Sequence, residues 1–232
     1  MRPHTIVIAS PHNLRLRDNI AIVTTENSTG QLKGPRGKSV SLRLKCDREF
    51  AQDLLQESTR KRLPVVGANY GTAEGTASDM AMDWGTLVPM WFVAKEERVR
   101  ARTVIVAPSR EIPLSRNIAF GMMIGKMAEK SKKRIVFIAS ADQAHAHQKS
   151  GPYGFHRSAA KYDQFVSRAI QRNRIESISR LGKRFVEEAK PDSFWQMAML
   201  AGVTSVVKMQ GSLLSYAVPT YYGMLCASFV RA

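Results

Sequence analysis

Cysteine and histidine are scarce in this sequence, and each shortage limits the kinds of site that the chain can form. It holds two cysteines and five histidines in 232 residues. The cysteines, Cys46 and Cys226, lie far apart and form neither a metal-binding motif nor a disulfide framework, which fits a reducing, cytoplasmic setting. With so few histidines, each one that follows an apolar segment is a candidate for chemistry.

Long hydrophobic runs are missing as well. No apolar run reaches the roughly 18 residues that a membrane-spanning helix needs. The apolar stretch at residues 5–10 is too short for a signal peptide, and charged residues follow it at once. We therefore expect no membrane partner and a cytoplasmic protein. The hydrophobic share of 44% and the charged share of 23% are ordinary for a folded protein.

Acidic residues are few relative to basic ones. The 35 Lys and Arg residues outnumber the 19 Asp and Glu residues, which gives a net charge of +16. The basic residues are spread along the chain, with no basic tail and no helix-turn-helix or zinc-finger signature, so we interpret them as a solvated surface. A nucleic-acid interface is the alternative, and a positive field also suits an anionic aromatic substrate.

Apolar β-branched runs alternate with amphipathic segments, which is typical of a sheet covered by helices. We expect strands over 5–10, 19–25, 40–45, 65–70, 103–108, 134–140 and 205–209. We expect helices over 47–57 (with Asp47 as N-cap), 113–130, 158–179 (broken near Asn173) and 193–201, a helix or tight turn over 86–91, loops over 26–39 and 71–83, and closing segments over 213–217 and 221–229. The prediction is a single α/β domain with a mixed, mostly parallel central sheet and helices on both faces.

Two of the predicted strands end in serine and then deliver a histidine. Ser10-Pro11-His12 follows the first strand, and the strand over 134–140 ends at Ser140, five residues before His145. Each histidine alone is more often an ordinary loop residue. Because the carboxyl ends of parallel strands carry the sites of open α/β sheets, we interpret the pair as groups that converge on one crevice.

Four stretches then carry a resemblance to a known family. They are RPHTIVIASPHNLRLRDNIAIVT (2–24), MDWGTLVPMWF (82–92), IVFIASADQAHAHQKSGPYGF (135–155) and GSLLSYAVPTYYGMLCASF (211–229). In this order they resemble the class III extradiol ring-cleavage dioxygenases of the LigB type, including the DOPA-dioxygenase-like branch. The second stretch is similar to the family's DHG-x-x-VPL motif, and the third to its serine–histidine turn and Gly-Pro-Tyr-Gly loop.

The resemblance implies a role for each matching residue. His12 would be a metal ligand, and His145 would be the acid/base histidine that helps to deprotonate a catechol. The family's carboxylate ligand falls on Asp192, with Glu188 as the fallback; the alternative for Asp192 is a helix N-cap. Two histidines and one carboxylate are the usual ligands of Fe(II) in such oxygenases, and the same set accepts Zn(II) or Mn(II).

Three departures from the family pattern change this expectation. The family's first ligand histidine lies on an N-terminal strand that this sequence does not contain. Trp84 takes the place of the DHG histidine, and Tyr216-Ala217 stands where a polar or acidic residue is common. One imidazole and one carboxylate hold a divalent metal more weakly than a full triad, so we expect weak Fe(II) binding. We expect the substrate pocket to be lined by Asp83, Trp84, His147 and Tyr153, with Tyr221 and Tyr222 as further candidates that are more often packing residues.

The resemblance therefore favours an enzyme that opens a catechol-type aromatic ring with O₂ and Fe(II). The first alternative is a catalytically impaired member of the same family that binds a ligand or serves as a scaffold. The second is a basic nucleic-acid-binding protein, whose affinity would fall steeply with salt. The sequence leaves a homodimer open and does not name the aromatic substrate.

Overall fold

The computed structural model describes residues 2–34, 37–95 and 100–232. They form two compact units: residues 1–116 with 127–140, and residues 117–126 with 141–232. Helix α3 (Leu114–Lys130) contributes residues to both. The prediction of one domain stays a prediction.

The first unit is built on a five-stranded sheet of order β5-β2-β7-β1-β8. Its strands are β1 (Thr5–Ala9), β2 (Ile20–Val23), β5 (Val65–Ala68), β7 (Arg102–Ala107) and β8 (Ile135–Ala139). β1 runs parallel to both β7 and β8, whereas β2 runs antiparallel to β7 and parallel to β5. The predicted mixed, mostly parallel sheet is confirmed.

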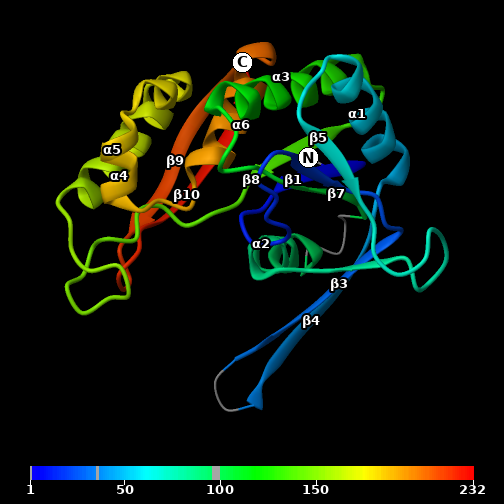
Figure 1. The fold of residues 1–232 in the computed structure, drawn as a ribbon, viewed down its shortest axis with the longest axis horizontal. Coiled ribbons are helices and arrows are strands. Elements are labelled where there is room, and N and C mark those ends of the chain that lie inside the picture. Colours follow the sequence, from blue (N-terminus) through cyan, green and yellow to red (C-terminus); the bar gives the residue numbers. More distant parts are fainter. Residues whose placement is uncertain (1, 35–36, 96–99) are drawn as a thin grey trace. The chain divides into compact units, whose positions relative to one another are not determined.

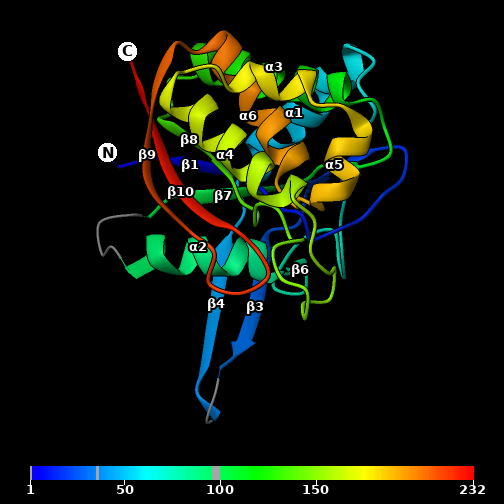
Figure 2. The same ribbon diagram turned by 90° about the vertical axis from the view of Figure 1, so that its left-hand side faces the viewer.

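Helices cover both faces of this sheet in the first unit. Helix α1 (Arg48–Arg60) lies on one face and helix α2 (Trp84–Lys95) on the other (Figures 1 and 2). Ile6 and Ile8 of β1 belong to the same buried cluster as Leu87 and Met90 of α2. A strand buried on both faces needs apolar residues at successive positions, which explains the unbroken β-branched run in β1.

A second, three-stranded sheet extends from the first unit as an arm (Figure 1). Its order is β4-β3-β6, with β3 (Asn27–Lys33), β4 (Ser39–Lys45) and β6 (Asp79–Ala81). The loop expected over 26–39 was wrong, because β3 occupies 27–33. Its polar sequence NSTGQLK carries no strand signal, and it is a strand because it pairs with β4 on one side and β6 on the other.

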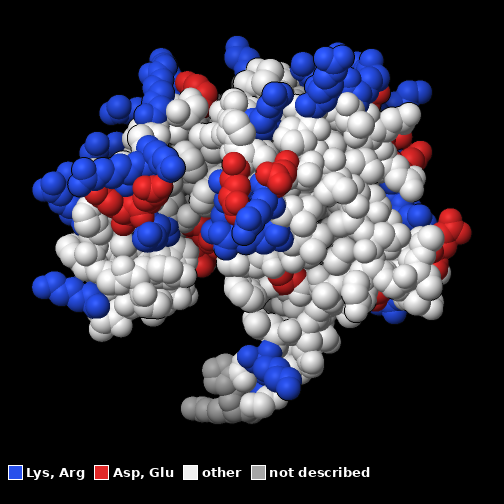
Figure 3. All heavy atoms as spheres, viewed as in Figure 1, with Lys and Arg blue, Asp and Glu red and all other residues white. Residues whose placement is uncertain are grey.

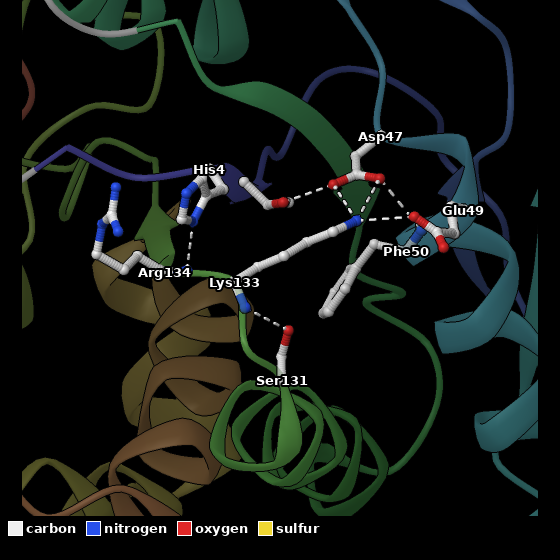
Figure 4. A network of polar contacts seen from close by, with 8 residues as sticks. His4, Asp47, Glu49, Phe50, Ser131, Lys133 and Arg134 are labelled. Carbon is white, nitrogen blue, oxygen red and sulfur yellow. Dashed lines mark hydrogen bonds and ion pairs between the residues drawn. The ribbon is translucent and has the colours of Figure 1, made fainter.

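A buried carboxylate, that of Asp47, links the amino-terminal end of the five-stranded sheet to α1 (Figure 4). Asp47 caps α1 by accepting a hydrogen bond of 3.3 Å from the Phe50 amide, as predicted, and it also accepts one of 2.5 Å from the Thr5 hydroxyl. Lys133, in the turn before β8, reaches Asp47 at 3.4 Å and Glu49 at 2.9 Å. One carboxylate therefore fixes the starts of β1, α1 and β8 relative to one another.

The second unit is mainly helical and ends in a hairpin. It contains α4 (Ser158–Gln171), the 3₁₀-helix η2 (Ile175–Arg180), α5 (Lys183–Ala189), α6 (Phe194–Val206) and the antiparallel strands β9 (Met209–Ala217) and β10 (Met224–Arg231). The predicted break near Asn173 is confirmed: Asn173 lies between α4 and η2 with φ 53°. The strand expected over 205–209 was wrong, because α6 continues to Val206 and β9 begins at Met209.

Glycines allow α3 and α6 to cross at very short range in this second unit. A Cβ at Gly121 would lie 1.9 Å from the carbonyl oxygen of Met199, and one at Gly202 would lie 2.0 Å from that of Ile118. No side chain fits there, so the two backbones are in direct contact. α6 is apolar on all sides and buried over most of its length. Across the parts of the chain that the structure describes, no helix is both long and apolar enough to cross a membrane.

Candidate functional site

The first candidate group lies in the first unit, where two serines at strand ends hold the turn Asp83–Gly85. The hydroxyl of Ser10, directly after β1, donates to the Asp83 carboxylate. The hydroxyl of Ser140, directly after β8, donates to the carbonyl oxygen of Gly85 at 2.5 Å. Gly85 must be glycine, because a Cβ there would lie 2.5 Å from the Ser10 hydroxyl. The two serines noticed in the sequence therefore fix one turn.

A proline inside α2 explains why the Gly85 carbonyl is free to accept this bond. In an α-helix the carbonyl of residue i accepts from the amide of residue i+4. The residue four positions after Gly85 is Pro89, which lies within α2 and has no amide hydrogen. Ser140 therefore supplies the donor that Pro89 cannot, and it anchors the first turn of α2 to the end of β8.

The turn places Trp84 against His12. The two ring centroids are 4.3 Å apart with the rings tilted by 34°. Both side chains line a cavity of about 300 Å³ together with Asp83, and its remaining lining residues are Asn13, Gln31, Leu32, Ala81, Met82 and Leu87. The structure thus brings together three predicted site residues of the first unit: His12, Asp83 and Trp84. Their roles stay predictions.

The second candidate group surrounds His145, in the second unit. The His145 amide donates to the carbonyls of Ala189 and Lys190 at 3.1 and 3.2 Å, and its ring Nδ1 lies 3.0 Å from the Lys190 carbonyl. A carbonyl can only accept, so Nδ1 carries the hydrogen and the neutral ring keeps its lone pair on Nε2. Lys190 presents this carbonyl from a left-handed backbone conformation, φ 55°, at the end of α5.

Three tyrosine rings lie around His145. The centroid of the Tyr153 ring is 5.4 Å from that of the imidazole, and those of Tyr221 and Tyr222 are each 5.8 Å away. Tyr153 is 54% exposed, so this aromatic wall is open to solvent. Tyr153, which was predicted to line the pocket, therefore lies beside His145, which was predicted to be the base.

Charged groups set the basicity of His145. Burial lowers the pKa of His145, but the Asp142 carboxylate, the charge of Asp192 and the Lys190 carbonyl outweigh burial and raise the pKa above its ordinary value. The Asp142 oxygen lies 3.7 Å from Nε2. A raised pKa strengthens His145 as a base, which suits a group that takes a proton from a phenolic hydroxyl and returns it later.

The remaining predicted residues of the second unit have partners of their own. Asp192 is buried just before α6, and its amide donates to the Gln143 carbonyl at 3.3 Å. The Nε2 of His147 lies 2.8 Å from the Asp163 carboxylate, and its side chain is 9% exposed. The structure therefore places His147 in a buried pair with Asp163, and its role in a substrate pocket stays a prediction. The fallback ligand Glu188 pairs with Arg184 at 2.9 Å.

The donor atoms that are present determine whether a metal ion fits. His12 and Asp192 are the ligand types that Fe(II) takes. Over the described ranges, with their gaps at 35–36 and 96–99, no group of three or more His, Cys, Asp or Glu side chains is placed to hold a metal ion. These residues do not by themselves fit a complete iron site, which needs at least one further donor.

Several residues of the two groups were not predicted from the sequence. The Lys190 carbonyl orients the His145 ring, and the Asp142 carboxylate raises the pKa of that ring. Ser10 and Ser140 hold the turn that carries Trp84. The signal for the serines was present, since each directly follows an apolar strand. A signal for Asp163 was present too, because it interrupts the buried face of α4 with a carboxylate.

Basic side chains do not gather in one groove on the face shown in Figure 3. They are spread over it, with a concentration over α4 and α5 in which acidic side chains are interspersed. In α5, Lys183 pairs with Glu187 at 3.8 Å and Arg184 pairs with Glu188 at 2.9 Å. This distribution is typical of a solvated surface, as interpreted from the sequence.

Comparison with known proteins shows the family of the chain. Residues 1–225 match the family described as the catalytic LigB subunit of aromatic ring-opening dioxygenase. Protein CA_C1420 of Clostridium acetobutylicum is 28% identical over 215 residues, which cover 92% of this chain and 45% of that protein, so the chain spans less than half the relative's length. The crystal structure of the uncharacterized protein JW3007 from Escherichia coli K12 shares the fold, with a TM-score of 0.63 and 13% identity over 99% of this chain and 87% of the other. The match over almost the whole length confirms the predicted family: the chain belongs to the family of the catalytic LigB subunit of aromatic ring-opening dioxygenase.

Proposed function

We propose that the chain is an extradiol-type dioxygenase that opens a catechol-type aromatic ring with O₂. The observation that carries this proposal is the state of His145. Its Nδ1 hydrogen is held by the Lys190 carbonyl, its Nε2 lone pair is available, and three tyrosine rings stand around it. A planar phenol bound against these rings would meet a base of suitable pKa.

In this proposal His145 accepts the proton of a substrate hydroxyl at Nε2. The resulting imidazolium is stabilised by the Asp142 carboxylate, 3.7 Å away, and by the charge of Asp192. The Lys190 carbonyl keeps the ring oriented in both protonation states, because Nδ1 donates in each. Tyr153 supplies an aromatic contact surface, and Asp83 and Trp84 shape the cavity beside His12.

The cofactor proposed is Fe(II), with His12 and Asp192 as ligands and with Zn(II) or Mn(II) as alternatives. When bound, such a metal supplies the Lewis acidity and the redox chemistry that ring opening with O₂ requires. Because this pair is not a complete ligand set, we expect iron to bind weakly to this chain. Iron content after anaerobic reconstitution, with His12→Ala as the control, tests the assignment.

One observation favours a second candidate, a ligand-binding protein without turnover. Trp84 stacks on the His12 ring at the position where the family carries a titratable histidine. The two candidates differ in a simple experiment: oxygen uptake with a panel of catechols in the presence of Fe(II). The enzyme consumes O₂ and loses this activity in His145→Gln, whereas the binding protein binds catechols and consumes none.

A further inference from the structure

One buried carboxylate in the second unit is not explained by the roles assigned so far. Asp163 lies in the middle of α4 with no exposed surface, among apolar residues of the same helix face such as Tyr162 and Val166. Burying a carboxylate is costly unless several donors compensate for the lost water. A carboxylate buried at this position therefore needs hydrogen-bond donors around it.

Three donors from two segments converge on Asp163. Its Oδ1 accepts a hydrogen bond of 2.9 Å from the Ala144 amide, and its Oδ2 accepts one of 2.8 Å from the Tyr216 hydroxyl of β9. The Nε2 of His147 lies 2.8 Å from the same Oδ2. Gly223 closes the remaining side, since a Cβ there would lie 2.0 Å from Oδ2.

Two of these three donors belong to the short segment that carries His145. We define residues 143–147 as the His145 strap. Ala144 is bound on both sides, because its amide donates to Asp163 and its carbonyl accepts from the Gly223 amide at 2.9 Å. The strap contains no helix and only isolated bridge pairings, so the bonds of Asp163 to Ala144 and His147 add to the backbone hydrogen bonds that hold its conformation.

The direct neighbour of Ala144 is His145. A rotation of the Ala144 peptide would move the His145 backbone and turn its ring away from the Lys190 carbonyl, 3.0 Å from Nδ1. Burial raises the pKa of Asp163, opposed by its three donors, so the donors are needed for the charged form to persist. The structure therefore couples a carboxylate of α4 to the direction in which His145 Nε2 points.

We propose that Asp163 is a positioning residue for His145: it holds the strap at Ala144 and His147 and so fixes the orientation of the imidazole. The inference rests on the proposed function only in taking His145 as the acid/base group. Tyr216 shares in this role, because its hydroxyl donates to the oxygen that also meets His147.

The test compares the full chain with Asp163→Asn, which keeps the shape and removes the charge, and with the control Glu176→Gln, which removes an exposed charge. Amide hydrogen exchange is measured at Ala144 and His145 and in the core of α4, and the His145 ring is followed by its Cε1–Hε1 NMR signal, assigned with His145→Gln. We expect exchange at Ala144 and His145 to accelerate about tenfold to a hundredfold in Asp163→Asn, since hydrogen bonds to charged groups are strong. The His145 signal should shift, while the α4 core and the Glu176→Gln protein stay unchanged.

Unchanged exchange at Ala144 and an unshifted His145 signal would overturn the inference, and so would equal acceleration throughout the unit, which indicates plain destabilisation. If Asp163→Asn does not fold, Tyr216→Phe removes one donor and should produce the same local changes at smaller size. These readouts need no substrate. A chain that consumes no O₂ would contradict the proposed function, while the exchange data would still decide the positioning role.

Discussion

The Ser140 hydroxyl donates to the carbonyl oxygen of Gly85 at 2.5 Å, in the place that the amide of residue 89 would fill if that residue were not proline. A break in the hydrogen-bonding pattern of α2 thus becomes an anchor between α2 and β8. The anchor sets the turn that carries Trp84, and Trp84 in turn covers one face of His12. Local chain chemistry therefore determines the walls of the cavity in the first unit.

This relationship predicts a coupling between Ser140 and Pro89. Ser140→Ala should lower the free energy of unfolding by about 1–1.5 kcal/mol, because the Gly85 carbonyl loses its donor. In a Pro89→Ala background the helix supplies an amide to that carbonyl, so the same substitution should cost clearly less. Urea unfolding of the four proteins measures the coupling, and equal costs in the two backgrounds would refute the proposed exchange of donors.

Trp84 should contribute to the binding of aromatic ligands in the cavity beside His12. Trp84→Ala removes the ring that lines this cavity and should weaken binding of a catechol about threefold to tenfold, the usual effect of one aromatic contact. Phe92→Ala is the matched control, since Phe92 lies on the same helix, is 63% exposed and does not line the cavity. Titration with a chromophoric catechol such as 4-nitrocatechol measures both, and equal affinities for the two variants would argue against this role.

The pH dependence of turnover should report His145. The base must be neutral to accept a proton, and its pKa is raised by the Asp142 carboxylate and other groups, so the rate should rise with pH through a pKa above that of an ordinary histidine. Asp142→Asn removes a charge that favours the protonated ring, lowers the pKa and should move the rise to lower pH. Rate profiles of the two proteins, with Glu176→Gln as control, give the answer; a rise that moves to higher pH contradicts the assignment.

The close contact between the α3 and α6 backbones leads to a prediction about the stability of the protein. Gly121→Ala places a methyl group 1.9 Å from the Met199 carbonyl oxygen and should destabilise the protein by about 3 kcal/mol or more, because both backbones must move apart. Gly182→Ala is the control, since nothing lies within 4 Å of its Cβ position and its φ is −68°. It should cost less than about 1 kcal/mol, and thermal unfolding distinguishes the two.

Much of the fold could be predicted from the sequence where a local pattern decides the structure. Strands β1, β7 and β8 are apolar runs rich in β-branched residues, and Asp47 stands where an N-cap is preferred, so local rules suffice for them. Strand β3 could not be found in this way, because its polar residues are extended only through pairing with two partners. The same holds for the end of α6, where a strand was predicted over 205–209 but the buried helix continues to Val206.

The candidate site residues show the same difference between positions that a local sequence pattern predicts and positions that depend on tertiary structure. His12 and His145 could be named as candidates because each follows a strand in a chain with few histidines, and their roles stay predictions. The residues that orient them could not be identified, since they come from distant parts of the sequence. Lys190 and Asp163 meet the His145 strap from 45 and 19 residues away, contacts that depend on the tertiary structure.

Oxygen consumption tests the central claim most directly. The full chain, reconstituted anaerobically with Fe(II), is mixed with aerated buffer and a panel of catechols, beside His145→Gln and the Glu176→Gln control. The account predicts catechol-dependent O₂ uptake with a yellow ring-opened product in the wild type and in Glu176→Gln, and a loss of about a hundredfold or more in His145→Gln, as expected for an acid/base group. Uptake that is absent from the wild type, or equal in His145→Gln, would contradict the claim that His145 drives ring opening in this protein.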